Sequence, residues 1–300
     1  MKAVLLTDYG DVDKLVVEDV PEPAPGLREV KVQVEGASIN PIDVKLRRGD
    51  LRAMRKLEFP AILGRDVAGT VREVGADVKE FRVGDRVMGL VDHAYAEMVV
   101  APVEAFAKVP DEVGAEEASV LPLAGLTGAQ LVEEAVGVKP GDVVLVTGAL
   151  GSVGRVAVFA AKQRGARVLA GVRKSQREEA ETLEADGIVA LDEPSELDAL
   201  PLLDAIADTV NGSVLESLLP KVKRGGVVGT VLGKPKSNAG ELEVRTMMTH
   251  PDAERLTELG EAVADGELEL PVAQRFPLGE VRRAQRVAEQ HGVGKVVLVP

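Results

Sequence analysis

Length, composition and charge restrict what this chain can be. Its 300 residues, 45% of them apolar, are enough for two domains that each bury their own core. The formal net charge of -13 and the lack of a long Lys/Arg run disfavour nucleic acid as a partner. Cysteine is absent, which excludes disulfides, thiolate nucleophiles and Cys-ligated metal sites.

The N-terminal segment bears on location. It carries one Lys followed by acidic residues, whereas a signal peptide requires a basic start and a long apolar stretch. No apolar run approaches the roughly 18 residues of a membrane span. We therefore expect a soluble, cytoplasmic protein with no membrane contact.

The first 110 residues predict a β-rich domain. Short Val-rich runs such as EVKVQVEG and DRVMGL are bounded by Gly, Pro or Asp. In EVKVQVEG, Val30, Val32 and Val34 alternate with polar residues, the period of two that is typical of a strand with one face in water.

Beyond Pro110 the sequence predicts alternating strands and helices. Strands are expected at VVLV (143–146), RVLAGV (167–172), IVAL (188–191) and VVGTVLG (227–233), with helices at 152–165, 175–187 and 214–226. The segment LDAIADTV is compatible with either type of element. This alternation predicts an α/β domain with a doubly wound parallel sheet.

A glycine-rich turn runs from Gly148 to Gly154, between an apolar strand and a helix, which is the context that a dinucleotide-binding turn requires. Against the G-x-G-x-x-G pattern, Ala149 replaces the first glycine, Gly151 admits a pyrophosphate and Gly154 allows close packing of helix on strand. Free N–H groups at the helix start would hold the phosphates. The predicted cofactor contacts here are Ala149, Leu150, Gly151, Ser152, Val153 and Gly154. The alternative is that any tight strand-to-helix turn favours glycine.

The end of the next strand indicates which dinucleotide binds. An NAD-specific fold usually has Asp or Glu there, whereas RVLAGV is followed by Arg173, Lys174 and Ser175, with Arg177 close behind. Cations and a hydroxyl suit a 2′-phosphate, because a guanidinium matches phosphate oxygens. We therefore expect NADPH. The alternative is a solvated helix start whose cations pair with the glutamates that follow them.

Six segments together resemble one superfamily, the medium-chain dehydrogenase/reductases, in its zinc-free quinone oxidoreductase (zeta-crystallin-like) branch. In chain order they are ASINPIDVKLRRG, ILGRDVAGTVREVGADVKEFRVGDRVMG, AYAEMVV, PLAGLTGAQL, VLVTGALGSVG and GKVVLVP. The resemblance implies a GroES-like β-rich catalytic domain at residues 1–115, completed by a C-terminal return at 268–300. It also implies a Rossmann NADPH-binding domain at residues 116–267.

Metal ligands of the zinc-dependent relatives are missing. Those relatives carry a His-Glu pair after the glycine that corresponds to Gly64, and a Cys after the third strand. This chain has Arg65, Asp66 and Asn40 at these positions, with three histidines in all. We expect no metal, and we expect Asp66 to be structural and paired with a nearby Arg.

The short-chain dehydrogenases are a competing family, because TGALGSVG is similar to their glycine turn. Their chemistry needs a Tyr-x-x-x-Lys relay. Tyr9 is followed four residues later by Asp13 and Tyr95 by Val99, so the relay is absent and this family is set aside.

The resemblance implies an interdomain cleft in which a nicotinamide faces a quinone or an electron-poor alkene, with Asn40 and Tyr95 as catalytic candidates. Asn40 would direct its amide at the acceptor, although it is equally a turn residue before Pro41. Tyr95 would donate a proton, unless it is a half-buried strand tyrosine, while His93 beside it is expected at the surface.

Further cofactor contacts are implied by motif position. Thr127 would meet the nicotinamide end, with a helix N-cap as the alternative. Along the carboxyl edge of the sheet, the implied contacts are Val210, Asn211, Val231 and Leu232. Lys45 and Arg47 stand where the family often has a tyrosine, which suggests an acidic or phosphate-bearing acceptor.

Our leading expectation is an NADPH-dependent, zinc-independent oxidoreductase that transfers a hydride to a quinone. An enone or enoyl reductase would use the same hydride, so the sequence leaves that alternative open. A third alternative is an NADPH-binding sensor without turnover. The resemblance also suggests a homodimer that pairs edge strands, with VVGTVLG as the candidate edge.

Overall fold

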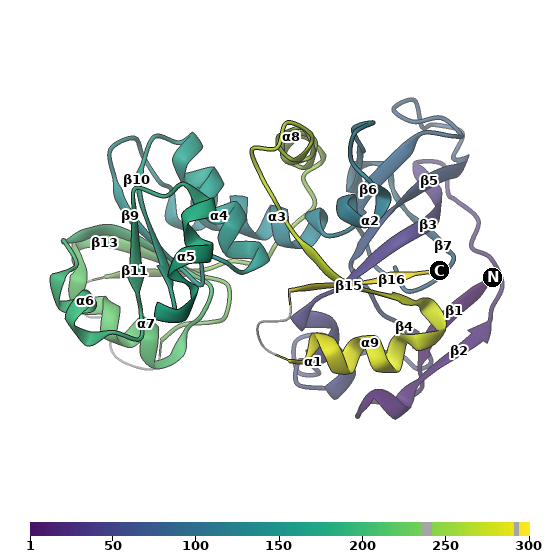
Figure 1. The fold of residues 1–300 in the computed structure, drawn as a ribbon. Helices are drawn as coiled ribbons and strands as arrows, with labels where there is room; N and C mark the ends of the chain where they lie inside the picture. The colour runs from purple at the N-terminus through teal and green to yellow at the C-terminus, as the bar shows by residue number, and fades with distance from the viewer. Residues whose placement is uncertain (236–241, 291–293) are drawn as a thin grey trace. The chain divides into compact units, whose positions relative to one another are not determined.

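The computed structural model describes residues 1–235, 242–290 and 294–300. The chain divides into two compact units, unit 1 with residues 1–123 and 250–300, and unit 2 with residues 124–249 (Figure 1). These limits differ from the predicted boundaries at 115 and 268. Helix α8 (Ala253–Ala264) lies in unit 1, because its Gly260 packs closely against Met88 and Pro110.

Unit 1 is built around the long strand β3 (Glu29–Ile39), as the sequence predicts. Val30, Val32 and Val34 are all buried, while the residues between them are half-buried. Strand β3 pairs antiparallel with β5 (Asp66–Val74), β7 (Met98–Pro102) and β16 (Lys295–Val299). In Figure 1 the yellow β16 runs beside the purple β3, so the C-terminal strand returns to unit 1.

The other strands of unit 1 are shorter: β1 (Lys2–Leu6), β2 (Leu15–Asp19), β4 (Ala61–Ile62), β6 (Arg86–Leu90), β8 (Phe106–Lys108) and β15 (Val272–Pro277). Its remaining helices are α1 (Pro41–Arg48), α2 (Ala115–Ala118) and α9 (Val281–Ala288), together with α3 (Leu121–Gln130), which crosses into unit 2.

Arg47 corrects one expectation. We expected it at the mouth of the substrate site, but its side chain on α1 is fully buried. Its guanidinium donates to the Gly10 carbonyl at 3.2 Å and to Gln285 Oε1 at 2.6 Å, and it pairs with Glu289. These partners tie α1 to α9, because a buried guanidinium needs its hydrogen bonds satisfied inside the protein. Arg47 is therefore not available to contact a hydride acceptor, whereas Lys45 is exposed.

Unit 2 confirms the expected parallel sheet. Its order is β11-β10-β9-β12-β13-β14, and every neighbouring pair is parallel. The strands are β9 (Val143–Thr147), β10 (Arg167–Val172), β11 (Gly187–Ala190), β12 (Leu203–Asp208), β13 (Val222–Thr230) and β14 (Glu243–Thr246). Its helices are α4 (Ser152–Gln163), α5 (Arg177–Ala180), α6 (Pro194–Ala199) and α7 (Gly212–Leu218). The segment LDAIADTV, left open by the sequence, contains strand β12.

Both faces of this sheet are covered. Successive side chains along a strand point to opposite faces, and in these strands the apolar side chains on each face are buried or half-buried. On one face Leu145, Leu169 and Ile206 form a cluster with Leu215 and Leu218 of α7. On the other face the π-helical segment Leu131–Val136 approaches Gly229 so closely that a side chain there would meet it.

The predicted helix at 214–226 is too long. Helix α7 ends at Leu218, a 3₁₀ turn follows, and β13 begins at Val222. Pro220 lies in that turn and has no N–H to continue an α-helix. The residues VKRGG therefore belong to a strand.

The predicted edge strand is also wrong. VVGTVLG overlaps β13, which is paired on both sides, by β12 and by β14. The outermost strands of the described sheet are β11 and β14. Strand β14 was missed because EVRT is short and polar. The homodimer itself stays a prediction.

No helix in the described ranges is long and apolar enough to cross a membrane.

We expect Gly154→Ala to destabilise the protein by about 1–3 kcal/mol, because the added carbon would lie 2.2 Å from the Gly148 carbonyl oxygen. Urea unfolding measures the effect. Gly279→Ala is the control, since nothing lies within 4 Å of a carbon added there. Equal unfolding midpoints for the two variants would contradict the close packing.

Candidate active site

The glycine-rich turn has the geometry of a phosphate-binding turn. Strand β9 leads into Gly148, whose φ of +62° suits glycine, and Gly151 then caps α4. The N–H groups of Ser152, Val153 and Gly154 open the helix, where no acceptor exists within the helix itself. Together with the helix dipole, these N–H groups fit a pyrophosphate.

Two of the residues predicted in this turn have other partners. Ala149 is fully buried, and its N–H bonds the carbonyl of Gly171 at 3.1 Å, so it is not available to a phosphate. The carbonyl of Leu150 accepts a bond from Arg155 Nε at 3.1 Å. Arg155, which the sequence analysis did not single out, thereby holds the turn from within α4 and also pairs with Glu179.

A buried carboxylate organises the carboxyl edge of the sheet in unit 2. Asp208, at the end of β12, accepts 2.8 Å bonds from the hydroxyls of Thr147 and Thr230 on the two neighbouring strands. It also accepts the N–H groups of Val210 and Asn211 at 3.2 and 3.0 Å. Sequence reasoning missed Asp208. The signal was a Thr or an Asp at the end of each of three strands.

Asp208 fixes the loop that the resemblance placed along the cofactor. The Asn211 side chain donates to the carbonyls of Leu232 and Gly233, at 3.2 and 3.1 Å. The structure thus brings Val210, Asn211, Val231 and Leu232 together at one edge, where Val210 and Leu232 are each 43% exposed. Exposed apolar side chains here offer a surface for a planar ring.

The cations after β10 do not behave alike. Lys174 pairs with Glu193 at 2.9 Å, and Arg177 forms a two-pronged pair with Glu196 at 2.5 and 2.6 Å. As the alternative has it, Lys174 and Arg177 lie in a helix start and pair with glutamates, but these are Glu193 and Glu196 and not the glutamates just after them. Among the described residues, the exposed guanidinium of Arg173 makes no hydrogen bond or ion pair, and Ser175 is exposed beside it.

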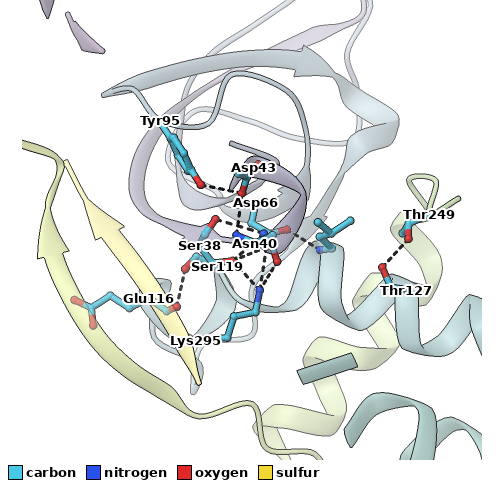
Figure 2. Close-up of polar contacts among 11 residues, drawn as sticks. Ser38, Asn40, Asp43, Asp66, Tyr95, Glu116, Ser119, Thr127, Thr249 and Lys295 are labelled. Carbon is cyan, nitrogen blue, oxygen red and sulfur yellow. Dashed lines mark hydrogen bonds and ion pairs between the residues drawn. The ribbon is translucent and has the colours of Figure 1, made fainter. Parts of the chain in front are cut away.

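Thr127 lies in the interior of α3, so it is not an N-cap. It is 8% exposed, and its hydroxyl is 2.6 Å from that of Thr249 (Figure 2).

In unit 1, Asp66 is the centre of a buried polar network, shown in Figure 2. Its Oδ2 accepts the hydroxyl of Ser38 at 2.5 Å and the amide of Asn40 at 2.7 Å. Its Oδ1 accepts the backbone N–H of Leu123 at 2.6 Å. Its cation is Lys295, 3.6 Å away on β16, and not the Arg that we expected. Burial lowers the pKa of Lys295, an effect that the neighbouring carboxylates oppose.

This network engages both ends of the Asn40 side chain. Nδ2 donates to Asp66, and Oδ1 accepts from Lys295 Nζ at 2.6 Å. The side chain is 5% exposed. The amide of Asn40 is therefore directed at protein groups.

Tyr95 is not half-buried on a strand, as the alternative had it, but fully buried in the loop before β7. Its hydroxyl donates to Asp43 Oδ2 at 2.8 Å, and burial raises its pKa well above 10. The phenol is therefore not presented to a substrate. His93 is exposed, as expected.

Asp43 is the least satisfied group of the cluster. Its Oδ2 accepts Tyr95 and the backbone N–H of Asn40 at 2.9 Å, but its buried Oδ1 has no partner among the described residues. Burial raises the pKa of Asp43 to about 6. Asp43 also lines a cavity of about 430 Å³ within unit 1.

The described residues contain no group of three or more His, Cys, Asp or Glu side chains placed to hold a metal.

We expect Asp43 to make stability depend on pH. With a pKa of about 6 in the folded protein and 3.8 unfolded, it holds a proton only in the folded state between these values, so stability falls as pH rises through this window. The full difference is roughly 3 kcal/mol. Asp43→Asn mimics the protonated form and should remove this dependence. Urea unfolding of both proteins at pH 4.5 and 7.5 measures it, and parallel pH dependence would contradict the raised pKa.

Comparison with known proteins agrees with both units. Residues 26–111 match the alcohol dehydrogenase GroES-like domain, and residues 183–298 match the zinc-binding dehydrogenase family. The chain is 32% identical to the chloroplast envelope quinone oxidoreductase homolog of Arabidopsis thaliana, over 94% of this chain and 92% of that one. It is 28% identical to a 2-haloacrylate reductase of a Burkholderia species, over 99% and 98%.

A solved structure, the quinone oxidoreductase of Coxiella burnetii, superposes with a TM-score of 0.88 at 30% identity and covers 100% of this chain and 99% of that one. Unit 1 thus has the GroES-like β fold and unit 2 the Rossmann-like fold, for which a nicotinamide cofactor is typical. The chain belongs to the medium-chain dehydrogenase/reductase superfamily, as an oxidoreductase of its quinone oxidoreductase branch.

Proposed function

We propose that this protein is an NADPH-dependent, zinc-independent oxidoreductase that transfers a hydride to a quinone. The cofactor choice rests on Arg173 at the end of β10, because its exposed guanidinium has no acidic partner among the described residues. A quinone is favoured as acceptor by the similarity to the Arabidopsis quinone oxidoreductase homolog and the Coxiella quinone oxidoreductase.

The cofactor would supply the hydride, and the chain's own residues would bind and orient. The first N–H groups of α4 bind the pyrophosphate, and the loop held by Asp208 supports the rest of the dinucleotide. Since the polar groups of Asn40 and Tyr95 are engaged inside unit 1, we propose that solvent delivers the proton to the reduced acceptor.

Arg173→Ala should raise the KM for NADPH about tenfold or more and leave the KM for NADH nearly unchanged, because only NADPH carries the 2′-phosphate. Glu193→Gln should lower the KM for NADPH severalfold, since it frees Lys174 from its pair. Steady-state kinetics with both cofactors measures these effects. If the ratio of the two KM values were unchanged in Arg173→Ala, the proposal that NADPH is the preferred cofactor would lose its basis.

A reductase of electron-poor alkenes is the second candidate, and the similarity to the 2-haloacrylate reductase favours it. NADPH oxidation across a panel of quinones, enones and 2-enoates separates the candidates. We expect turnover with quinones. Turnover with alkenes alone would replace the proposal, and tight NADPH binding with no acceptor above background would favour a sensor.

A further inference from the structure

Two guanidinium groups share one carboxylate at the cavity of unit 1. Asp92 Oδ1 is 3.1 Å from Arg55 and 3.3 Å from Arg65, and all three residues line the cavity. Arg65 uses its Nε for the Val91 carbonyl as well, at 2.9 Å, so its two terminal nitrogens make no hydrogen bond to the described residues. Guanidinium donors therefore outnumber their acceptors here.

The lining carries three cationic and three acidic side chains, and two of the cations are the guanidinium groups that share Asp92. Lys56 adds a third cation to the lining, while Glu58 and Asp43 are its other acids. Burial raises the pKa of Asp43 to about 6, so Asp43 loses its negative charge only in solution more acidic than that. A planar anion that enters the cavity would meet fork-shaped donors whose geometry matches a carboxylate.

The rest of the lining is mostly apolar, with Leu46, Leu57, Pro60, Ala61, Ile62 and Leu63, and His93 is its remaining polar side chain. A volume of about 430 Å³ lies within the range of small-molecule pockets, which combine apolar walls with a few polar groups that fix orientation. An inorganic anion would leave this apolar wall without a partner.

We propose that this cavity binds a small carboxylate with a flat apolar body, such as an aryl or alkenyl carboxylate, with Arg65 and Arg55 on the carboxylate. That an alkenyl carboxylate is also the hydride acceptor rests on the second candidate function, the reductase of electron-poor alkenes. The binding itself does not, because it needs neither cofactor nor turnover.

Calorimetric titration of the full chain with cinnamate, in the absence of NADPH, tests the site. Cinnamamide, its neutral counterpart, should bind at least tenfold more weakly. Arg65→Gln and Arg55→Gln should each weaken cinnamate binding about tenfold, with little effect on cinnamamide. Asp92→Asn should tighten cinnamate binding severalfold, because it releases both guanidinium groups.

Arg52→Gln is the matched control, since Arg52 is exposed on the same loop and does not line the cavity. It should leave cinnamate binding unchanged. Equal binding of cinnamate and cinnamamide would overturn the proposal, as would equal losses in Arg52→Gln and Arg55→Gln. If inorganic phosphate bound as tightly as cinnamate, the claim that the ligand needs a flat apolar body would be overturned. Binding without reduction of cinnamate-type acceptors would support the site and count against its role in turnover.

Discussion

The pairing of Asp66 with Lys295 is the interaction on which unit 1 depends. A carboxylate with no exposure to water is tolerable only when it is neutralised and fully hydrogen-bonded. Ser38, Asn40 and the N–H of Leu123 satisfy Asp66, while Lys295 supplies the charge. The network joins β3, β5, β16 and the start of α3, so removing one partner of the pair would cost about 3–5 kcal/mol.

Unit 2 also depends on a buried carboxylate, but this one is stabilised by hydrogen bonds and not by a cation. Asp208 is also fully buried, but hydroxyls and backbone N–H groups satisfy it at the ends of adjacent strands. One acid thus stabilises the edge of the sheet and shapes the loop next to it. The glycine-rich turn beside Asp208 requires no side chain to bind a phosphate, because backbone N–H groups at the start of α4 provide the donors.

Features that depend on the spacing of residues close together in the chain could be predicted from the sequence. The alternation of Val30, Val32 and Val34, and the strand-turn-helix around Gly151, are each contained within about twenty residues, and both are confirmed. Partners distant in the chain could not be predicted from one sequence. The cation of Asp66 lies more than two hundred residues away, and Arg47 is buried by α9, equally remote. The edge strand β14 was not predicted for another reason, because its sequence EVRT lacks the alternation of apolar and polar residues that indicates a strand.

The position of Lys295, after the whole of unit 2 in the chain, affects how the protein folds during synthesis. All strands of unit 2 lie in one uninterrupted stretch, so that unit has everything it needs once residue 249 has left the ribosome. The first part of unit 1 is made before unit 2, but the countercharge for Asp66 arrives after unit 2, with β16. Until then the nascent β domain has an acid that must stay hydrated, and its core closes only after unit 2 can already have folded.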